Sequence, residues 1–341
     1  MSDQDLRLVI NGISLTNFSA VSVSMGIDQI ADAFSIDADF NLSDTMQKIA
    51  LKPFQYSPFQ LYLGSSMLMS GTCESHGFSF SANSRSATIQ GRSKTGVLVD
   101  CPILDEFQFT KMTVAEIARK VCQPYGVSVR PDADSTQIED VTCEYGDTVA
   151  NFLTQLCTSR NLFLNSSFDG KLVISNGNVF ASSAPVAALS EGDGQMLSAR
   201  INYDGTRRFS EYTAASQKAG CEDLKATVRD AIVKKRRPKI EKLGDIDQNP
   251  ETTAKQLKGR GFAESMQLSV TVNGWTRKNG SRWAERQTII VKAPSLYMNS
   301  ASKWVIKNVN YTFSVDGGKT TALELVLPAS YTGNSGSEPW S

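Results

Sequence analysis

The chain has 341 residues, of which 40% are hydrophobic and 21% charged, and its formal net charge is zero. This length is enough for two or three domains with their own cores, and a neutral chain has no general attraction to nucleic acid or membranes. No apolar run approaches the roughly 20 residues of a membrane span, and the acidic N-terminus lacks a signal-peptide core. We therefore expect a protein made in the cytoplasm, with no stable membrane insertion.

The first 100 residues have the pattern of a β domain. Apolar and polar residues alternate from Phe34 to Phe40, which is typical of a strand with one face in water. One helical turn is possible within residues 45–51. About six short antiparallel strands in this length predict a small barrel or sandwich. Besides the strand at 34–40, we predict strands at residues 6–10, 59–63, 67–74, 77–82 and 87–91.

The middle of the chain carries the clearest local signals. Thr113 and Glu116 form a capping box, and the apolar residues that follow recur at helical spacing until the stop at residues 123–126. A second helix is predicted to begin at residue 147 or 148. Two short apolar runs then flank Asp169-Gly170, which predicts a hairpin. The middle is therefore a small α+β unit.

The last third returns to β structure. Residues 177–194 are rich in Ser, Ala and Gly, and we expect a linker or a loosely packed crossing there. A helical excursion is predicted at about 222–266, charged over its first part and with the apolar spacing of a helix over 251–266. Strands are predicted at 198–203, 209–215, 267–272, 288–291, 304–313 and 320–327.

The predicted fold is mainly β with an α+β insertion, in which two similar small antiparallel β-barrels flank a small α+β domain. A weak sequence repeat supports duplication, since residues 8–12 (LVING) resemble residues 270–274 (VTVNG). The predicted divisions are 1–100 for the first barrel, 101–190 for the α+β domain, 191–332 for the second barrel and 333–341 for a flexible tail.

Charge is unevenly distributed along the chain. Residues 1–50 hold seven Asp against Arg7 and Lys48, a net of −5, whereas residues 218–260 hold twelve Lys or Arg against seven acids, a net of +5. Such asymmetry fits head-to-tail contact between copies. Phosphate or nucleic-acid binding by residues 234–239 is the alternative, which is disfavoured because no aromatic residues interleave with the run. The candidate protein-contact residues are Lys234, Lys235, Arg236, Arg237, Asp28, Asp32, Asp37 and Asp39.

Cysteine and tryptophan residues favour packing over chemistry. Three of the four tryptophans, Trp275, Trp283 and Trp304, are predicted to pack the second β domain, with a sugar-stacking platform as the alternative. The cysteines are scattered without a CxxC motif, so we expect buried thiols rather than disulfides or a metal site. They are Cys73, Cys101, Cys122, Cys143, Cys157 and Cys221.

Catalytic motifs are absent from the sequence. His76 is the only histidine and falls in a predicted turn, so a triad or a zinc site is disfavoured. Carboxylate pairs for glycoside hydrolysis depend on spatial separation, and the sequence singles out none. We therefore predict no catalytic residue, no cofactor and no metal. An enzyme or sugar-binding module acting on the cell wall remains the alternative.

Residues 91–101 (GRSKTGVLVDC) resemble the end of the first barrel in the baseplate hub proteins of Mu-like contractile-tailed phages, the late control D or tail hub family. The resemblance is colinear and spans roughly residues 6 to 330. Departures are mild: Val97 stands where the family tends to have an acid, Asn279 replaces the acid of a turn, and Arg282 replaces a leucine. The further matching segments are 113–127, 145–172, 200–217, 228–233, 236–238, 272–275 and 280–283.

The resemblance implies a structural protein of the virion's tail baseplate, not an enzyme. It implies a homotrimer whose paired barrels form a pseudo-sixfold ring, joining the sixfold tail tube to the trimeric tail spike, with baseplate wedge proteins as further partners. DNA would pass through the central channel without specific binding. The acidic first barrel and the basic run would then meet around the ring, and the middle domain would widen the ring or contact a neighbour. The alternatives are a peptidoglycan-degrading tail module and a secretion-system spike base, the latter disfavoured because no long β-helix follows the second barrel.

Overall fold

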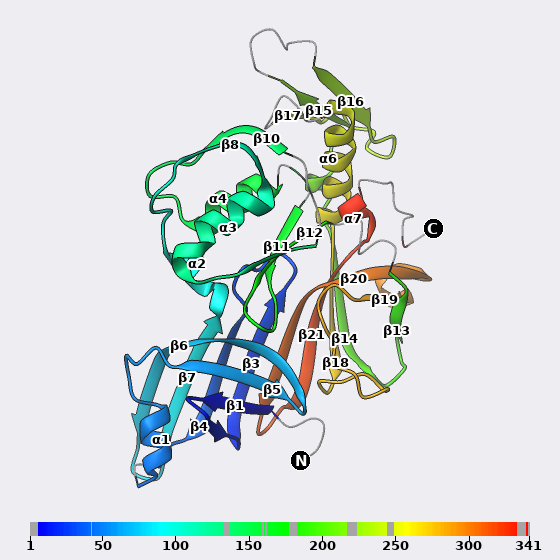
Figure 1. Ribbon diagram of the computed structural model, residues 1–341. Coiled ribbons are helices and arrows are strands. Elements are labelled where there is room, and N and C mark those ends of the chain that lie inside the picture. The colour runs from blue at the N-terminus through cyan, green and yellow to red at the C-terminus, as the bar shows by residue number, and fades with distance from the viewer. Residues whose placement is uncertain are drawn as a thin grey trace.

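The structure, a computed structural model, describes residues 6–41, 43–132, 137–158, 160, 162–176, 183–216, 224–243, 249–332 and 339. Figure 1 shows a first β region at the lower end, an α+β unit above it, a second β region, and a small sheet with one helix at the upper end. Cys221, Asp3, Asp5, the tail at 333–338 and part of the expected linker (177–182) lie outside the described residues.

The first β region contains one short helix among seven strands, as the alternating sequence predicts. Its elements are β1 (Leu6–Ile10), β2 (Ile13–Leu15), β3 (Phe18–Gly26), β4 (Ala33–Asp39), α1 (Thr45–Ala50), β5 (Pro58–Leu63), β6 (Ser66–Phe80) and β7 (Arg85–Ser93). One expectation is wrong here. The two strands predicted around His76 are the single strand β6, so His76 lies within a strand and not in a turn. A bulge between Cys73 and Ser75 interrupts the alternation there.

The middle unit follows the local sequence signals. Thr113 accepts from the Glu116 N–H, and Glu116 accepts from the Thr113 N–H, so the capping box is confirmed. Its apolar helix faces pack into a core of their own, which includes Cys122, Cys143 and Cys157. Its elements are η1 (Lys94–Gly96), α2 (Val97–Asp100), β8 (Gln108–Thr113), α3 (Val114–Cys122), η2 (Gln123–Tyr125), β9 (Val129–Pro131), β10 (Gln137–Thr142), α4 (Val149–Thr158), β11 (Leu162–Ser166) and β12 (Leu172–Asn176).

The second β region begins earlier than expected. Residues 185–190 of the predicted linker form strand β13, which pairs in parallel with β19. The strands and short helices of this region are β13 (Pro185–Ser190), β14 (Met196–Tyr203), β18 (Met266–Asn273), β19 (Thr288–Ala293), η4 (Pro294–Leu296), β20 (Met298–Ser314), β21 (Gly318–Val326) and α7 (Ala329–Thr332).

A small upper unit is inserted between β14 and β18. It consists of η3 (Gly205–Arg207), β15 (Glu211–Ala215), β16 (Lys225–Arg229), β17 (Pro238–Lys242) and α6 (Pro250–Glu264). The expected helical excursion at 222–266 is therefore wrong for its first part, because β16 and β17 flank β15 as a three-stranded sheet. The alternating burial of Ala226 and Val228 in β16 is that of a strand, although charged neighbours hide this period in the sequence.

The two β regions form one continuous sheet and repeat the same strand order. The order β3-β4-β7-β6-β5-β1 in the first region corresponds to β14-β18-β21-β20-β19-β13 in the second, and β3 pairs with β20 to join them. Bulges fall at matching places, between Phe18 and Ala20 in β3 and between Met196 and Ser198 in β14. The fold is thus mainly β with two similar β regions, and the strand pairs of the described residues run as an open path without closing a barrel.

The sequence echo that suggested duplication falls on non-equivalent strands. Residues 8–12 belong to the end of β1 and its turn, whereas residues 270–274 belong to the end of β18. In the repeated strand order, β18 corresponds to β4, and β1 corresponds to β13. The turns differ as well, since Asn11 and Gly12 both have positive φ, whereas only Gly274 does in the second turn. Duplication is supported by topology, not by this echo.

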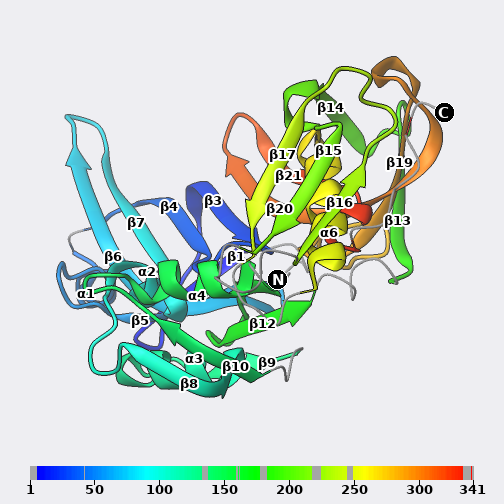
Figure 2. The same ribbon diagram turned by 90° about the horizontal axis from the view of Figure 1, so that it is seen from above.

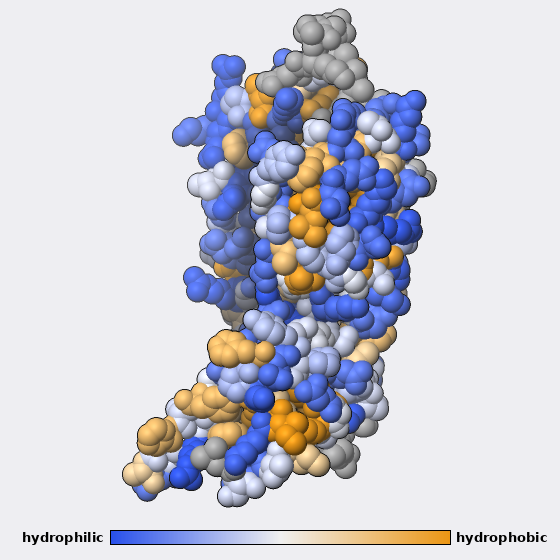
Figure 3. Space-filling view, turned by 60° about the vertical axis from the view of Figure 1, so that its left-hand side comes forward, coloured by the Kyte–Doolittle hydropathy of each residue, from blue (hydrophilic) through white to orange (hydrophobic). Residues whose placement is uncertain are grey.

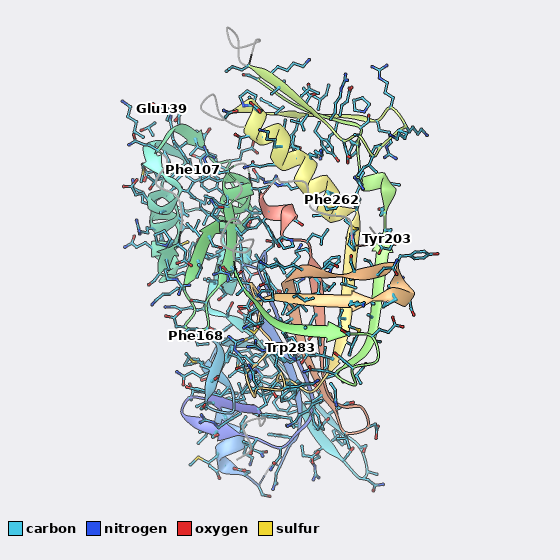
Figure 4. All side chains as sticks on the ribbon, turned by 90° about the vertical axis from the view of Figure 1, so that its right-hand side faces the viewer. Phe107, Glu139, Phe168, Tyr203, Phe262 and Trp283 are labelled. Carbon is cyan, nitrogen blue, oxygen red and sulfur yellow. The ribbon has the colours of Figure 1, made fainter. Side chains whose placement is uncertain are left out.

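Both β regions contribute to one large hydrophobic core. Trp275, Trp283 and Trp304 are at most 2% exposed, and Figure 4 shows Trp283 enclosed among strands. The indole N–H of Trp275 donates to the Thr312 carbonyl at 2.9 Å. The tryptophans therefore pack the second β region, as expected, and present no sugar-stacking platform.

Candidate protein-contact surfaces

The basic run lies in the connection between β16 and β17. Lys234, Lys235 and Arg236 are exposed, and Arg237 is half-buried. Arg237 donates to the Thr206 carbonyl at 2.9 Å, and its guanidinium carbon lies 5.4 Å from the ring centroid of Phe209. The first three residues are therefore available to a partner, whereas Arg237 stabilises the upper unit.

The acidic candidates divide in the same way. Asp39 is exposed, and Asp28 is exposed but forms an ion pair with Lys307 at 3.1 Å. Asp37 is half-buried and accepts from the Thr88 hydroxyl at 2.6 Å. Asp32 is only 2% exposed, so its assignment as a surface contact is wrong. Nothing in the sequence around Asp32 indicates this burial, in which its carboxylate accepts from the Gly26 N–H and its own N–H donates to the Ser93 hydroxyl.

Asp39 and the basic run lie toward opposite ends of the molecule, whereas Asp28 lines the cleft beside α6. Figure 1 places β4, which ends at Asp39, in the lower region and the β15–β17 sheet at the top. No described ion pair joins the basic run to the acidic strand. The two surfaces are thus separated within one chain by the length of the second β region.

A cleft of about 670 Å³ opens where the middle unit, α6 and the second β region meet. Two of its carboxylates are already engaged, because Lys307 pairs with Asp28 and Glu324 accepts from Asn308 at 2.6 Å. Arg260 of α6 spans it and donates to the Thr158 carbonyl at 2.7 Å. The cleft is held by contacts between parts of the chain, which indicates a junction rather than a catalytic site.

The middle unit is fixed to both β regions. Its hairpin turn contacts the first region, since the Ser70 hydroxyl donates to the Phe168 carbonyl at 3.1 Å, and Figure 4 places Phe168 just above that region. Toward the second region, Arg286 donates to the Asn165 side chain and, at 3.1 Å, to the Ser175 hydroxyl. The unit therefore braces the two β regions against each other.

Arg286 and its neighbours form a polar cluster that the sequence did not reveal. Arg286 has φ +66°, which is uncommon for a residue other than glycine, and its guanidinium lies 3.7 Å from Asp132 of the middle unit. Burial raises the pKa of Asp32 well above its usual value, and Glu285 adds to the shift, whereas Gly26, Arg282 and Arg286 oppose it. No local pattern signals these contacts, because they join residues far apart in the chain.

Chemically reactive groups are sparse and dispersed in the described part of the chain. Burial raises the pKa of Cys73 and of Cys122 to about 12, which keeps these thiols protonated. Burial also lowers the pKa of His76. Within the described ranges, no group of three or more His, Cys, Asp or Glu is arranged to hold a metal ion.

None of the helices in the described residues is both long and apolar enough to cross a membrane.

Large apolar side chains gather at the lower end of the molecule. Figure 3 shows apolar residues over this end, which the first β region forms. Phe54 and Phe80 are 85% and 87% exposed, and Tyr56 is 64% exposed. Such exposure is unusual for aromatic residues and marks a candidate contact surface.

The comparisons with known proteins agree with this structural reading. The second-domain model of the gp44-like baseplate hub proteins matches residues 95–176, which are most of the middle unit. The baseplate hub protein gp44 of Escherichia phage Mu is 27% identical over 344 residues, covering 94% of this chain and 87% of that protein.

Solved structures share the fold over nearly the whole chain. The 43 kDa tail protein of prophage MuSo2 from Shewanella oneidensis has a TM-score of 0.81 at 23% identity, covering 96% of this chain and 99% of its own. A tail protein from Neisseria meningitidis MC58 also scores 0.81, at 21% identity, with 96% and 98% covered. A type VI secretion component of E. coli scores 0.55 at 10% identity, with 94% and 76% covered. The resemblance is confirmed: this chain is similar over most of its length to a baseplate hub protein of Mu-like tails, a structural component of the phage tail.

Proposed function

We propose that the protein is the structural hub of a contractile-tail baseplate, acting as a homotrimer. Each chain would contribute its two similar β regions, so three chains would form a ring of six. Such a ring would match the sixfold tail tube on one side and the trimeric spike on the other. The work of the protein is geometric, and no catalytic step is required.

One observation carries this proposal: the two β regions repeat the same strand order and join through β3 and β20. A chain with two equivalent units, joined by a defined contact, converts threefold symmetry into pseudo-sixfold symmetry when the contact recurs between copies. The similarity to a baseplate hub protein supports the same conclusion.

The separated charges suggest different partners at the two ends. Lys234, Lys235 and Arg236 would contact an acidic protein surface, and Asp39 would contact a different partner surface, because the two groups lie toward opposite ends of the molecule. The sequence suggested that the acidic strand of one copy contacts the basic run of the next. The separation of the two groups within one chain makes that contact less favourable than contacts with two different partners. The tube, the spike and the wedge proteins are the candidate partners, and DNA would cross the channel without specific binding.

We retain three divisions as a proposal, with one adjustment. The first region would end near residue 100, and the middle unit would end before β13, near residue 183, because β13 pairs with β19 of the second region. The middle unit would brace the two β regions through Ser70 and Arg286.

Mass measurement and electron microscopy test this function. The purified chain, alone and with its spike, should sediment as a trimer at micromolar concentration, and particles should show threefold rings with six lobes around a hole. A stable monomer in both preparations would exclude the hub proposal. Release of sugar from purified peptidoglycan that is lost on changing a single carboxylate would instead establish the enzyme alternative.

A further inference from the structure

We propose that residues 75–80 of β6 pair with β14 of a second copy, in the way that β20 pairs with β3 inside one chain. The inference rests on the proposed trimer and names the surfaces that would close it. It follows from the repeated strand order, since β6 corresponds to β20 and β14 corresponds to β3.

The correspondence holds residue by residue. β6 has a bulge between Cys73 and Ser75 where it pairs with β7, and β20 has one between Ile306 and Asn308 where it pairs with β21. Beyond the bulge, Ser75 pairs with Gln90, as Asn308 pairs with Glu324. Counting onward, Phe78 corresponds to Tyr311, and Phe80 to Phe313.

The other strand pair aligns independently. Ala20 follows the bulge in β3 and pairs with Asp37, and Ser198 follows the bulge in β14 and pairs with Thr271. The strands between these two pairs give the same alignment. Asp37 pairs with Thr88, which lies two residues before Gln90 in β7. Thr271 pairs with Ala322, which lies two residues before Glu324 in β21. Val21 therefore corresponds to Ala199, and Val23 to Ile201.

The two edges are unpaired in the described chain at the positions where their counterparts meet. In β20, residues 298–305 pair with β19, and residues 308–314 pair with β3. In β6, residues 66–72 pair with β5, and the described residues offer no strand beside 75–80 opposite β7. β14 likewise pairs only with β18 among the described strands. Unpaired edges of this length are templates for pairing with another chain.

The internal joint supplies the register. Tyr311 pairs with Val23, Thr312 with Ser22 and Phe313 with Val21. If the contact between copies has the register of the internal joint, Phe78 should face Ile201 of the neighbour, Ser79 should face Arg200, and Phe80 should face Ala199.

The exposure of these side chains fits burial by a second copy. Tyr311 is 1% exposed in the internal joint, whereas its counterpart Phe78 is 45% exposed and Phe80 is 87% exposed. Ile201 and Ala199, their expected partners, are half-buried at the edge of the core. Pairing would bury both phenylalanines against apolar side chains of the neighbour. Burial of apolar surface is the main favourable contribution to the free energy of most protein–protein association.

The geometry of the chain allows the contact to close. Figure 2 shows β6 and β7 at one end and β14 at the other, with β3 between them. Because the two edges differ, the contact is head-to-tail, and it forms a ring where the rotation closes. Two joints of one kind per chain, one internal and one between copies, give six equivalent joints in a trimer.

Cysteine pairing tests the register. The variant Ser79→Cys with Arg200→Cys, oxidised at the concentration where the full chain assembles, should give a covalent trimer on a non-reducing gel that reductant dissolves. The matched control is Ser79→Cys with Asn202→Cys, whose cysteines would be offset along the strand to about 7–8 Å, beyond disulfide reach. The two single variants control for the native thiols.

The outcomes separate this inference from the proposed function. If the unmodified chain is a trimer but the Ser79–Arg200 pair links no more than the control, the edge pairing is wrong and the hub proposal stands. If the unmodified chain stays monomeric alone and with its spike, the hub proposal itself fails.

A second variant removes an apolar anchor without touching the core. Phe80→Ser should raise the concentration at which trimers dissociate at least tenfold. Val315→Ser is the control, since Val315 is also apolar and 74% exposed but lies at the turn after β20. Equal assembly of the two variants would overturn the proposed contact.

Discussion

Arg208 and Asp230 form the most deeply buried ion pair among the described residues of the upper unit. Arg208 Nη2 lies 2.9 Å from Asp230 Oδ2, and the two side chains are 11% and 4% exposed. The Arg208 guanidinium carbon also lies 5.1 Å from the ring centroid of Phe262 on α6. One arginine therefore connects the end of β16 to the helix that supports the sheet.

Replacing Arg208 by Met should destabilise the upper unit by about 3–5 kcal/mol, because a buried carboxylate would lose its partner. Hydrogen exchange of β15–β17 measures this local stability. The control is Arg229→Met, since Arg229 pairs with Glu211 at 3.2 Å but is 82% exposed, and an exposed pair contributes about 0–1 kcal/mol. Equal protection in the two variants would show that the buried pair does not hold the unit.

Asp32 should make the folding stability of the protein depend on pH. Burial, with a contribution from Glu285, raises the pKa of Asp32 well above its usual value. The folded state therefore binds a proton that the unfolded state releases between the two pKa values. Stability from this group is full below the unfolded pKa, near 4, and is lost as pH rises toward the folded pKa.

The variant Asp32→Asn should remove this loss. An amide keeps an oxygen to accept from the Gly26 N–H, which lies 3.3 Å from the carboxylate, and it carries no charge. The difference in unfolding temperature between Asp32→Asn and the parent should grow from pH 4 upward and then level off. The control Asp39→Asn changes an exposed residue and should show no such trend. A parallel rise for both would mean that Asp32 does not titrate abnormally.

Local sequence signals predicted local structure well. The capping box of Thr113 and Glu116 could be predicted because two residues three positions apart determine it, and the helix starting near residue 148 followed from apolar spacing. The strand at 209–215 was predicted and is β15, but β16 and β17 were missed. In β16, Lys225 and Arg229 occupy exposed positions, so that only two apolar residues mark the period.

Contacts between distant parts could not be read from the sequence. Asp32 was placed on a surface only because it is one of the seven acids of residues 1–50, yet it is 2% exposed and lies within the electrostatic influence of Arg282, Glu285 and Arg286, which are distant in the chain. Duplication was inferred from the wrong pair of segments, since Asn-Gly turns recur for their own conformational reasons. The strand order identifies which strands of the two β regions correspond. This order depends on pairing between strands that are far apart in the sequence, so no local pattern reveals it.

The basic run offers a test of partner contact. Reversing Lys234, Lys235 and Arg236 to Glu should weaken binding to an acidic partner, more strongly at low salt than at high salt, because exposed charges are screened. Arg237 is left unchanged because it packs on Phe209 within the chain. Assembly with spike and tube, measured by co-sedimentation at two salt concentrations, reports the effect.

The control for that variant reverses three exposed lysines elsewhere. Lys48, Lys52 and Lys111 are exposed and give the same change in net charge when replaced by Glu. If the two triple variants lose assembly equally, the effect is one of net charge and not of the basic run. If neither loses assembly at low salt, the run is a solvated loop.

Arg286 should fix the middle unit to the second β region. It donates to Asn165 and to Ser175, on β11 and β12, from a backbone with φ +66°. Arg286→Ala removes these bonds at an interface between parts, so hydrogen exchange in residues 162–176 should rise at least tenfold while the cores on either side stay protected. Arg130→Ala is the control, because Arg130 pairs with Asp132 at 3.1 Å inside the middle unit and has no such role between parts. Unchanged exchange in Arg286→Ala would show that the other contacts of the unit hold it in place without Arg286.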